Sequence, residues 1–427
     1  MSESVVQAPS PVSAREKPLR SLMAYGAAIY AMGLFVERFL VYPILIRRWP
    51  APVFGTFLTL RFATILAFEP LRGGLVAAAF RHYSRSDESA RALLAPRALG
   101  VFAVFILPFV AGAVLARGWA AARWPAAGPF WTPLVLFAAG SALFTLAVKK
   151  FRFAQDLRSE FLLTAFLWIL LCGGVAAAAR LSPAWPAWVY AFSVLAALVV
   201  TGFSGGLRPR LSGGMPLLRE AAPFTAATTV SLFADQIDKY SVAYFLGAGD
   251  LTLYYAAASI PRMMFAPFDV LDDSMQTHLT RKSSLADVSA RKRLWVRWLL
   301  ILSPAAVLLG GAVLGKPAMA LLYGKSFWAG GHRLYYILLA GTSLGVYWPL
   351  CRTYINQYVR AGTVAKLNMT SSTVTVGCAV SGAALGGITG AATGMAVGLA
   401  LRGLLFAFLA ARHFGREIFS SSGADGS

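Results

Sequence analysis

Residues 53–80 read VFGTFLTLRFATILAFEPLRGGLVAAAF, an apolar run that carries three charged residues, Arg61, Glu69 and Arg72. About 20 mostly apolar residues are enough to cross a bilayer as a helix. A charge at the centre of the bilayer costs about 2.5–3.5 kcal/mol on insertion scales, so a charged side chain there is expected to face the protein interior or a water-filled cavity. The stretch therefore predicts a membrane helix with a polar face.

The rest of the chain extends this pattern. The protein has 427 residues, of which 58% are hydrophobic and 13% are charged, whereas a soluble domain has about 25% charged residues. This composition excludes a soluble enzyme, a disordered chain and a disulfide scaffold, because too few polar side chains remain to cover a core in water. Twelve apolar runs of membrane-spanning length fall near 22–46, 53–80, 98–116, 129–148, 160–179, 185–203, 221–246, 251–278, 294–314, 334–351, 363–383 and 387–411.

Basic residues predict the orientation. Counted over alternate loops, Lys and Arg number 24 on the side that holds both termini and 8 on the other side. Because cytoplasmic loops are enriched in these residues, both termini are expected in the cytoplasm. We attribute the net charge of +21 to this asymmetry and to contact with anionic membrane lipids rather than to nucleic acid.

An internal repeat divides the spans into two sets of six. Residues 54–57 (FGTF) resemble 251–254 (LTLY), and 68–70 (FEP) resemble 265–267 (FAP), all at an offset of 197 residues. Two such halves with the same sense in the membrane are related by a pseudo-two-fold axis along the membrane normal, with a cavity between them. We therefore predict an all-α polytopic membrane protein with about twelve transmembrane helices in two six-helix lobes. The expected parts are a cytoplasmic tail at 1–20, a first lobe at 21–203, a cytoplasmic inter-lobe loop at 204–220, a second lobe at 221–411 and a cytoplasmic tail at 412–427.

Charged residues inside the spans mark the predicted site, and they gather in spans 1, 2, 7 and 8, which are equivalent pairs in the repeat. Helical spacing places Arg262, Asp269 and Asp273 on one face of span 8. Asp235 and Lys239 are four residues apart, the separation of an ion pair. Lining of a cavity and structural pairing between helices are both open interpretations. We predict that an anionic head group binds to Arg61, Arg72, Lys239 and Arg262, and that ion coupling or charge pairing involves Glu37, Glu69, Asp235, Asp238 and Asp269.

The loops predict no soluble catalytic domain. Gaps between the apolar runs are short and basic, His and Cys residues show no metal-ligand spacing, and no Gly-rich loop ends in Gly-Lys-Ser/Thr. We expect no enzymatic activity, no cofactor and no metal site, and any transport is expected to run without an ATPase in this chain.

Four parts of the chain carry a family resemblance: 43–45 with 53–57, 238–240 with 244–247 and 253–256, 322–327, and 387–394. In that order they resemble the first hairpin, the start of the second half, the extracytoplasmic loop before span 10 and the entry to the last helix of Wzx-type oligosaccharide flippases. These flippases belong to the multidrug/oligosaccharidyl-lipid/polysaccharide (MOP) exporter superfamily.

The resemblance implies a flippase that moves undecaprenyl-pyrophosphate-linked oligosaccharides across the bacterial inner membrane for O-antigen or other surface polysaccharide, including lipopolysaccharide. It implies a proton or sodium ion as the coupling ion and a polysaccharide polymerase as a further partner. The alternative is a small-molecule cation antiporter of the related multidrug (MATE) class, in which a carboxylate would dominate the site. A third alternative is a membrane-embedded polymerase or ligase for the same glycans. It would need a large extracytoplasmic loop with catalytic residues, and the sequence has no such loop.

Overall fold

The computed structural model describes residues 25, 28–29, 32–33, 35–83, 88–123, 125–153, 156–205, 209–269, 271, 290–358 and 361–419. Within these ranges the chain is helical, with no strand. The reason is that backbone N–H and C=O groups in hydrocarbon find partners only inside a helix or a closed barrel. The helices are η1 (Val36–Val41), α2 (Tyr42–Arg48), α3 (Ala51–Tyr83), α4 (Glu88–Leu115), α5 (Arg117–Arg123), η2 (Pro125–Ala127), α6 (Gly128–Phe153), α7 (Leu157–Ala178), α8 (Ala184–Gly205), α9 (Gly214–Phe245), α10 (Ala248–Met263), α12 (Ala290–Leu322), α13 (Lys325–Gly345), α14 (Tyr347–Tyr358) and α15 (Ala361–Phe419).

These helices confirm the predicted all-α polytopic membrane fold. Eight segments of the described chain are long and apolar enough to cross a membrane by length and composition. The last of them, 366–413, comprises two crossings, because α15 is broken at Gly386 and Gly387, where Gly387 takes a φ of 58°. The other three crossings are η1 with α2, α9 and α10. The charges of α9 lower its mean hydropathy, α10 has only 16 described residues, and the first part of span 22–46 lies outside the described ranges.

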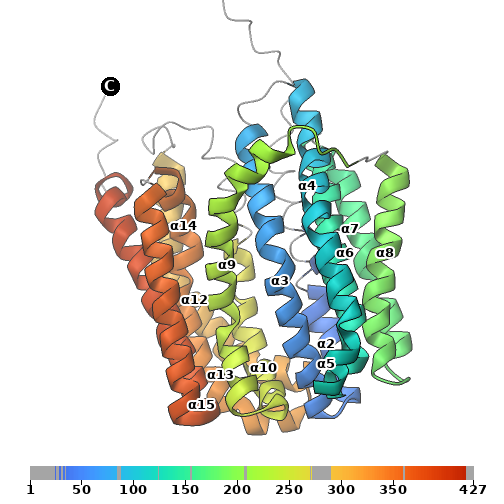
Figure 1. Ribbon diagram of the computed structural model, residues 1–427. Coiled ribbons are helices and arrows are strands. Elements are labelled where there is room, and N and C mark those ends of the chain that lie inside the picture. Colours follow the sequence, from blue (N-terminus) through green and yellow to red (C-terminus); the bar gives the residue numbers. More distant parts are fainter. Residues whose placement is uncertain are drawn as a thin grey trace, which may run out of the picture.

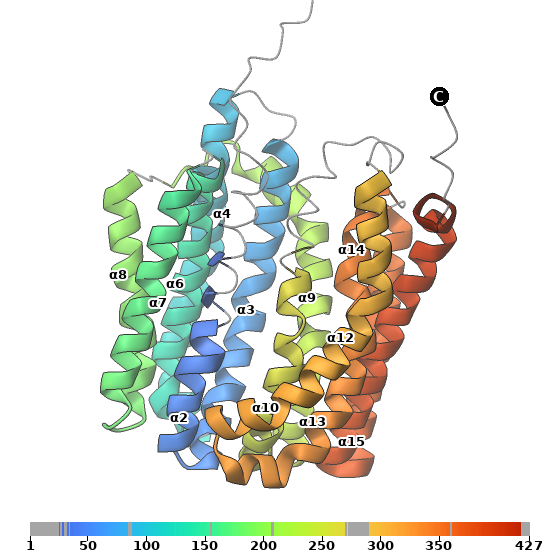
Figure 2. The same cartoon turned by 180° about the vertical axis from the view of Figure 1, so that it is seen from behind.

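Two lobes lie side by side (Figures 1 and 2). One contains α2–α8 and the other α9–α15, and α3 packs against α9 where the lobes meet. We use the name terminal face for the end of the bundle at which α15 ends. The other end of the bundle is called the opposite face. The turns at Trp49–Pro50, Gly247, Gly324 and Gly386–Gly387 all lie at the opposite face.

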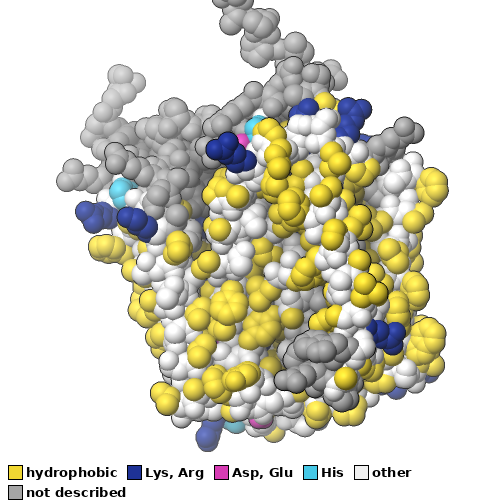
Figure 3. All heavy atoms as spheres, in the orientation of Figure 1, with side chains coloured by type: hydrophobic (Ala, Val, Ile, Leu, Met, Phe, Trp, Pro, Cys, Tyr) yellow, Lys and Arg dark blue, Asp and Glu magenta, His cyan; other side chains and the backbone are white. Residues whose placement is uncertain are grey.

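The outer surface fits a bilayer. In Figure 3 hydrophobic side chains cover the sides, and most visible Lys and Arg side chains lie at the upper and lower margins. Large apolar side chains far from the helix ends, such as Leu107, Ile169 and Leu309, are strongly exposed. In water such a surface would be a liability for aggregation, whereas in a membrane it is the surface that contacts lipid.

Two reciprocal contacts between the lobes follow the 197-residue repeat. The Thr252 hydroxyl donates a hydrogen bond of 2.6 Å to the main-chain oxygen of Ala51. Conversely, Gly55 lies so close to the main-chain oxygen of Ala248 that a Cβ atom there would overlap it. Gly55 and Thr252 are 197 residues apart, as are Ala51 and Ala248. Replacing each residue by its equivalent in the other lobe therefore converts the contact of Thr252 with Ala51 into that of Gly55 with Ala248. A two-fold relation between the lobes requires this.

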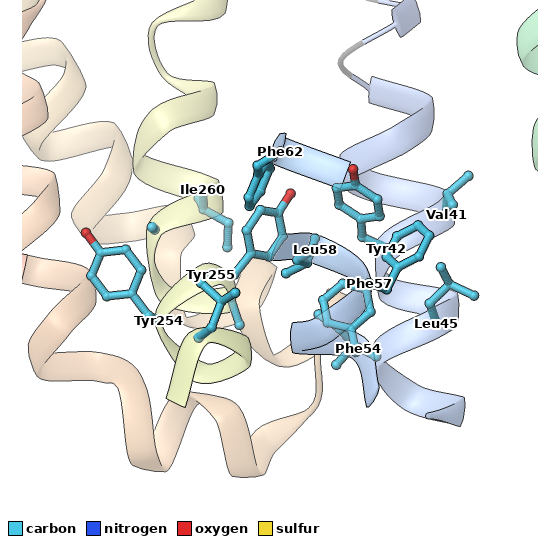
Figure 4. Close-up of a cluster of buried hydrophobic side chains, with 14 of the residues drawn as sticks. Val41, Tyr42, Leu45, Phe54, Phe57, Leu58, Phe62, Tyr254, Tyr255 and Ile260 are labelled. Atoms are coloured by element: carbon cyan, nitrogen blue, oxygen red, sulfur yellow. The ribbon is translucent and has the colours of Figure 1, made fainter. Parts of the chain in front are cut away.

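Aromatic side chains fill the space around these contacts (Figure 4). Tyr255 of α10 lies between the lobes, with ring centroids 5.4 Å from Tyr42, 6.2 Å from Phe54 and 6.1 Å from Phe62. Aromatic pairs in tilted or edge-on arrangements are stabilising beyond their buried area. The lobes thus meet near the opposite face through a core of aromatic side chains.

The two Phe-x-Pro motifs of the repeat differ in structure. Helix α3 continues through Pro70 as far as Tyr83, whereas α10 ends at Met263, just before Phe265-Ala266-Pro267. A proline inside a helix removes one hydrogen bond and bends or breaks the helix. Span 8 is therefore not the single continuous helix that its apolar pattern predicts.

We predict that Gly55→Ala destabilises the protein, because the added Cβ must displace the Ala248 backbone. Overpacking of this kind costs about 1–3 kcal/mol. Gly112→Ala in α4 is the matched control, since that Cβ would meet no atom within 4 Å and alanine favours helix by up to about 1 kcal/mol. Thermal unfolding of purified protein in detergent measures both, and a midpoint for Gly55→Ala as high as that of Gly112→Ala would contradict the close lobe contact.

Candidate functional site

Glu37 is the centre of a polar network in the first lobe. It lies in the π-helix η1, and its carboxylate accepts hydrogen bonds from Arg61 Nε at 3.1 Å and Tyr42 Oη at 2.7 Å. Tyr190 Oη of α8 lies at 3.5 Å from the same oxygen. The Arg61 guanidinium also stands 4.8 Å from the ring centroid of Phe137. Glu37 thus joins the first membrane helix to α3 and α8.

Asp238 is the centre of a second network, in the second lobe. Its side chain is fully buried, forms an ion pair with Arg262 and accepts a hydrogen bond of 2.6 Å from Tyr254 Oη. Lys239 Nζ lies 3.9 Å from the same carboxylate. Lys239 also donates to the Gln236 side chain and lies 4.9 Å from the ring centroid of Phe62 in the first lobe.

The two networks repeat one motif. Each joins a carboxylate in the first helix of its lobe to an arginine 24 residues later in the second helix, Glu37 with Arg61 and Asp238 with Arg262. These residues are related by an offset of 201, four more than the offset of the backbone contacts. Four residues are about one helical turn, or about 6 Å along the axis. The motif in the second lobe is therefore displaced by one turn within the repeat.

The ion-pair partner of Asp235 differs from the one predicted. Its carboxylate pairs with Arg402 Nη1 of α15 at 3.0 Å, and not with Lys239, which reaches only the Asp235 main-chain oxygen at 3.3 Å. The Arg402 side chain is almost fully buried, donates 3.0 Å to Ser231 Oγ and lies 3.7 Å from the Trp348 ring. A buried guanidinium requires a counterion, and Asp235 supplies it.

The remaining predicted residues lie nearer the terminal face. Glu69 and Arg72, three residues apart in α3, form an ion pair, with Nε–Oε2 at 2.7 Å. Arg72 is 11 residues beyond Arg61 in α3, about 16 Å along the axis. Asp269 lies 3.9 Å from Arg352. Because α10 ends at Met263, Asp269 does not share a helix face with Arg262 as predicted, and Asp273 lies outside the described residues.

Arg38 is a site residue that the sequence analysis did not assign. It lies close enough to Lys239, Tyr255 and Tyr323 to interact with them electrostatically, and Tyr323 Oη is 3.4 Å from its main-chain oxygen. No carboxylate of the described chain pairs with the Arg38 guanidinium. The available signal was the adjacent Glu37-Arg38 pair within an apolar run. The π-helix η1 that contains both residues could not be read from the sequence, although such turns are frequent at functional sites.

A cavity of about 190 Å³ lies beside the first network. Its lining comes from α3, α6 and α9: Arg61, Thr64, Ile65, Phe68, Glu69, Ala138, Ser141 and Leu232. Arg61 and Glu69 place one charge of each sign on its wall, and Ser141 adds a hydroxyl. Leu232 belongs to the second lobe, so this cavity lies where movement between the lobes would alter its shape. In the described ranges no group of His, Cys, Asp and Glu could hold a metal ion.

We predict that Asp238→Asn destabilises the protein strongly, because it leaves the buried Arg262 and the nearby Lys239 without a carboxylate. Removing one partner of a buried ion pair costs about 3–5 kcal/mol. Arg262→Gln added to Asp238→Asn should recover part of this loss in a double-mutant cycle. Glu69→Gln is the control at a pair whose side chains are about a quarter exposed, where about 1 kcal/mol or less is expected. Equal thermal shifts for the two single variants would disprove this difference.

The sequence matches no protein-family model and no curated relative, but solved structures share its fold. A MATE transporter in complex with MaL6 is 12% identical with a TM-score of 0.68, over 94% of this chain and 97% of that one. The lipid II flippase MurJ in an inward closed conformation is 13% identical with a TM-score of 0.63, over 92% and 87%. A MOP superfamily transporter from Pyrococcus furiosus is 12% identical with a TM-score of 0.63, over 93% and 92%. This chain therefore has the fold of the transporters of the MOP superfamily.

Proposed function

We propose that this protein is a flippase that moves undecaprenyl-pyrophosphate-linked oligosaccharides across the bacterial inner membrane for surface polysaccharide synthesis. The observation that carries the proposal is the charge at the lobe boundary. Lys239 and Arg262 share the carboxylate of Asp238, and the nearby carboxylate of Asp235 is the counterion of Arg402. Arg38 lies within electrostatic reach of Lys239, so four cations lie near two described carboxylates. Unpaired cations inside a membrane are costly, and a pyrophosphate would supply the missing negative charge.

The proposed binding residues have different roles. Arg38 and Lys239, which lack a dedicated carboxylate, contact the pyrophosphate directly, and Arg262 joins them when its hold on Asp238 loosens. Arg61 lines the 190 Å³ cavity and contacts the head group from the first lobe. Arg72 lies about 16 Å further along α3 and meets the head group nearer the terminal face. The MurJ structure supports a lipid-linked substrate, since that protein of the same fold is a lipid II flippase.

Orientation and partners belong to the same proposal. The 24-to-8 distribution of Lys and Arg supports cytoplasmic termini, and thus a cytoplasmic terminal face. The lobes comprise 21–203 and 221–411, joined by the loop at 204–220. The product is an oligosaccharide on the outer leaflet, which a polysaccharide polymerase would take up.

Ion coupling is assigned first to Glu37. A proton on this carboxylate would remove the charge that holds Arg61 and so release the guanidinium toward the cavity. Asp235, Asp238, Glu69 and Asp269 each pair with an arginine and act mainly in holding these bases in place. The coupling ion is a proton or a sodium ion.

A small-molecule cation antiporter of the MATE class is the second candidate. It is favoured by one observation, the Asp235 carboxylate, which is 35% exposed although it lies within a membrane helix. In that function a carboxylate, rather than the cluster of cations, would bind the substrate. The excess of cations at the lobe boundary argues against it.

We predict that Arg38→Gln with Lys239→Gln abolishes flipping of a fluorescent polyprenyl-pyrophosphate oligosaccharide in proteoliposomes. Loss of one charge-assisted hydrogen bond costs about 1.5–3 kcal/mol, or at least about tenfold for each residue. Arg180→Gln with Arg117→Gln, at exposed arginines of the opposite face, removes the same charge and should leave flipping unchanged. Gradient-driven efflux of a small cation without any flipping would replace this proposal by the antiporter.

We predict that Glu37→Gln retains flipping but loses its dependence on an imposed proton gradient, because the amide cannot exchange the proton that releases Arg61. The same proteoliposomes, with and without a pH difference, measure this dependence. Glu69→Gln, which removes a carboxylate from the other end of the cavity, is the control and should keep the gradient response. A Glu37→Gln variant that still responds fully to the gradient would exclude Glu37 as the coupling group.

A further inference from the structure

An apolar groove crosses the boundary between the lobes at the opposite face. It lies between the first membrane helix and the end of α12, which run close together at the lower edge of Figure 2. Its volume is about 170 Å³, and its lining consists of Phe39, Leu40, Pro43, Ile44, Arg47, Leu321 and Leu322. We call it the α2–α12 groove. Leu40 and Leu321 are exposed toward the surrounding lipid, so in a bilayer the groove is open to hydrocarbon chains.

Basic side chains stand at one end of the groove. Arg47 and Arg48 form the last turn of α2, next to the turn at Trp49–Pro50, and both are exposed. Arg47 donates one hydrogen bond to the main-chain oxygen of Leu321. A guanidinium has five N–H donors in a planar fork, so most of the donors of Arg47 remain for another acceptor. No described carboxylate pairs with either arginine.

This combination has the shape and charge of a phospholipid. Because α2 ends here, the two guanidinium groups are expected at the level of the head groups, where basic residues attract anionic lipids. The apolar lining continues from them into the depth of hydrocarbon. We propose that the α2–α12 groove binds one anionic glycerophospholipid, with its phosphate at Arg47 and Arg48 and an acyl chain along Leu40, Ile44 and Leu321.

The groove lies between the two lobes, so a lipid bound in it affects how the lobes move relative to each other. Arg47 belongs to the first lobe and Leu321 to the second, so separation of the lobes at the opposite face would break their hydrogen bond and divide the groove. A lipid bound here stabilises the arrangement in which this face is closed. Any carrier with two moving lobes would have this property, so the inference stands whether the cargo is a glycan lipid or a small cation.

The test uses the full-length protein in detergent with added lipid, read by native mass spectrometry. One phosphatidylglycerol should remain bound in preference to phosphatidylcholine. Arg47→Gln with Arg48→Gln should weaken this binding by about fivefold for each residue, the factor that corresponds to about 1 kcal/mol per basic residue at a membrane surface. Ile44→Trp, which fills the groove without changing charge, should weaken the binding of both lipids.

Arg117→Gln with Arg180→Gln is the matched control and should retain the bound phosphatidylglycerol. Equal affinity for the two lipids, or an equal loss in this control, would reduce the site to general attraction by surface charge and overturn the proposal. Displacement of phosphatidylglycerol by stoichiometric polyprenyl phosphate would also overturn it, since the groove would then hold the tail of a carried lipid. Flipping measured in pure phosphatidylcholine tests the proposed function separately.

Discussion

A charge in the interior of a membrane needs a partner, and this constraint governs how the helices of this protein meet. Glu37 binds Arg61, Asp238 binds Arg262 and Asp235 binds Arg402. Each pair joins two helices, so each charge that would otherwise oppose insertion becomes a link between crossings. Such pairs are costly to assemble and very costly to split. They specify which helices lie together more strongly than apolar packing can, because lipid tails are as apolar as leucine side chains.

The repeat accounts for the framework but not for the balance of charge. At the 197-residue offset Lys239 takes the place of Tyr42 and Arg262 that of Ile65. In the first lobe Tyr42 donates a hydrogen bond to the carboxylate of Glu37. In the second lobe the equivalent residue, Lys239, is a cation close to the carboxylate of Asp238. Lys239 lies against Phe62 and near Arg38 of the other lobe. An excess of positive charge at the boundary results from this inequality between two otherwise similar halves.

The sequence predicts what depends on composition and on short spacing. Hydropathy predicted the number of crossings, and the repeat predicted the two lobes. The prediction that Asp235 pairs with Lys239 was wrong. The true partner, Arg402, lies 167 residues away, and only the packing of α15 against α9 brings it near. Arg38 was not assigned a role, because its neighbours Lys239, Tyr255 and Tyr323 come from distant parts of the chain that only the packing of the helices brings near. The functional roles of the site residues stay predictions.

The distribution of ion pairs also bears on movement. Within the described chain the pairs deep in the membrane join helices of the same lobe, whereas the lobes meet through the rings around Tyr255, the Thr252 hydroxyl and close backbone contacts. Between described residues of different lobes, the one contact within ion-pair distance is that of His82 Nε2 with Glu220 Oε2, near the terminal face on partly exposed side chains. Aromatic contacts are lost gradually as surfaces slide or tilt, but splitting a buried ion pair leaves two charges in hydrocarbon. Rocking of the lobes as rigid bodies therefore avoids the largest electrostatic cost, and each lobe keeps its charges neutralised while the boundary opens. The cations that remain under-compensated at the boundary are then the groups that an anionic cargo meets first.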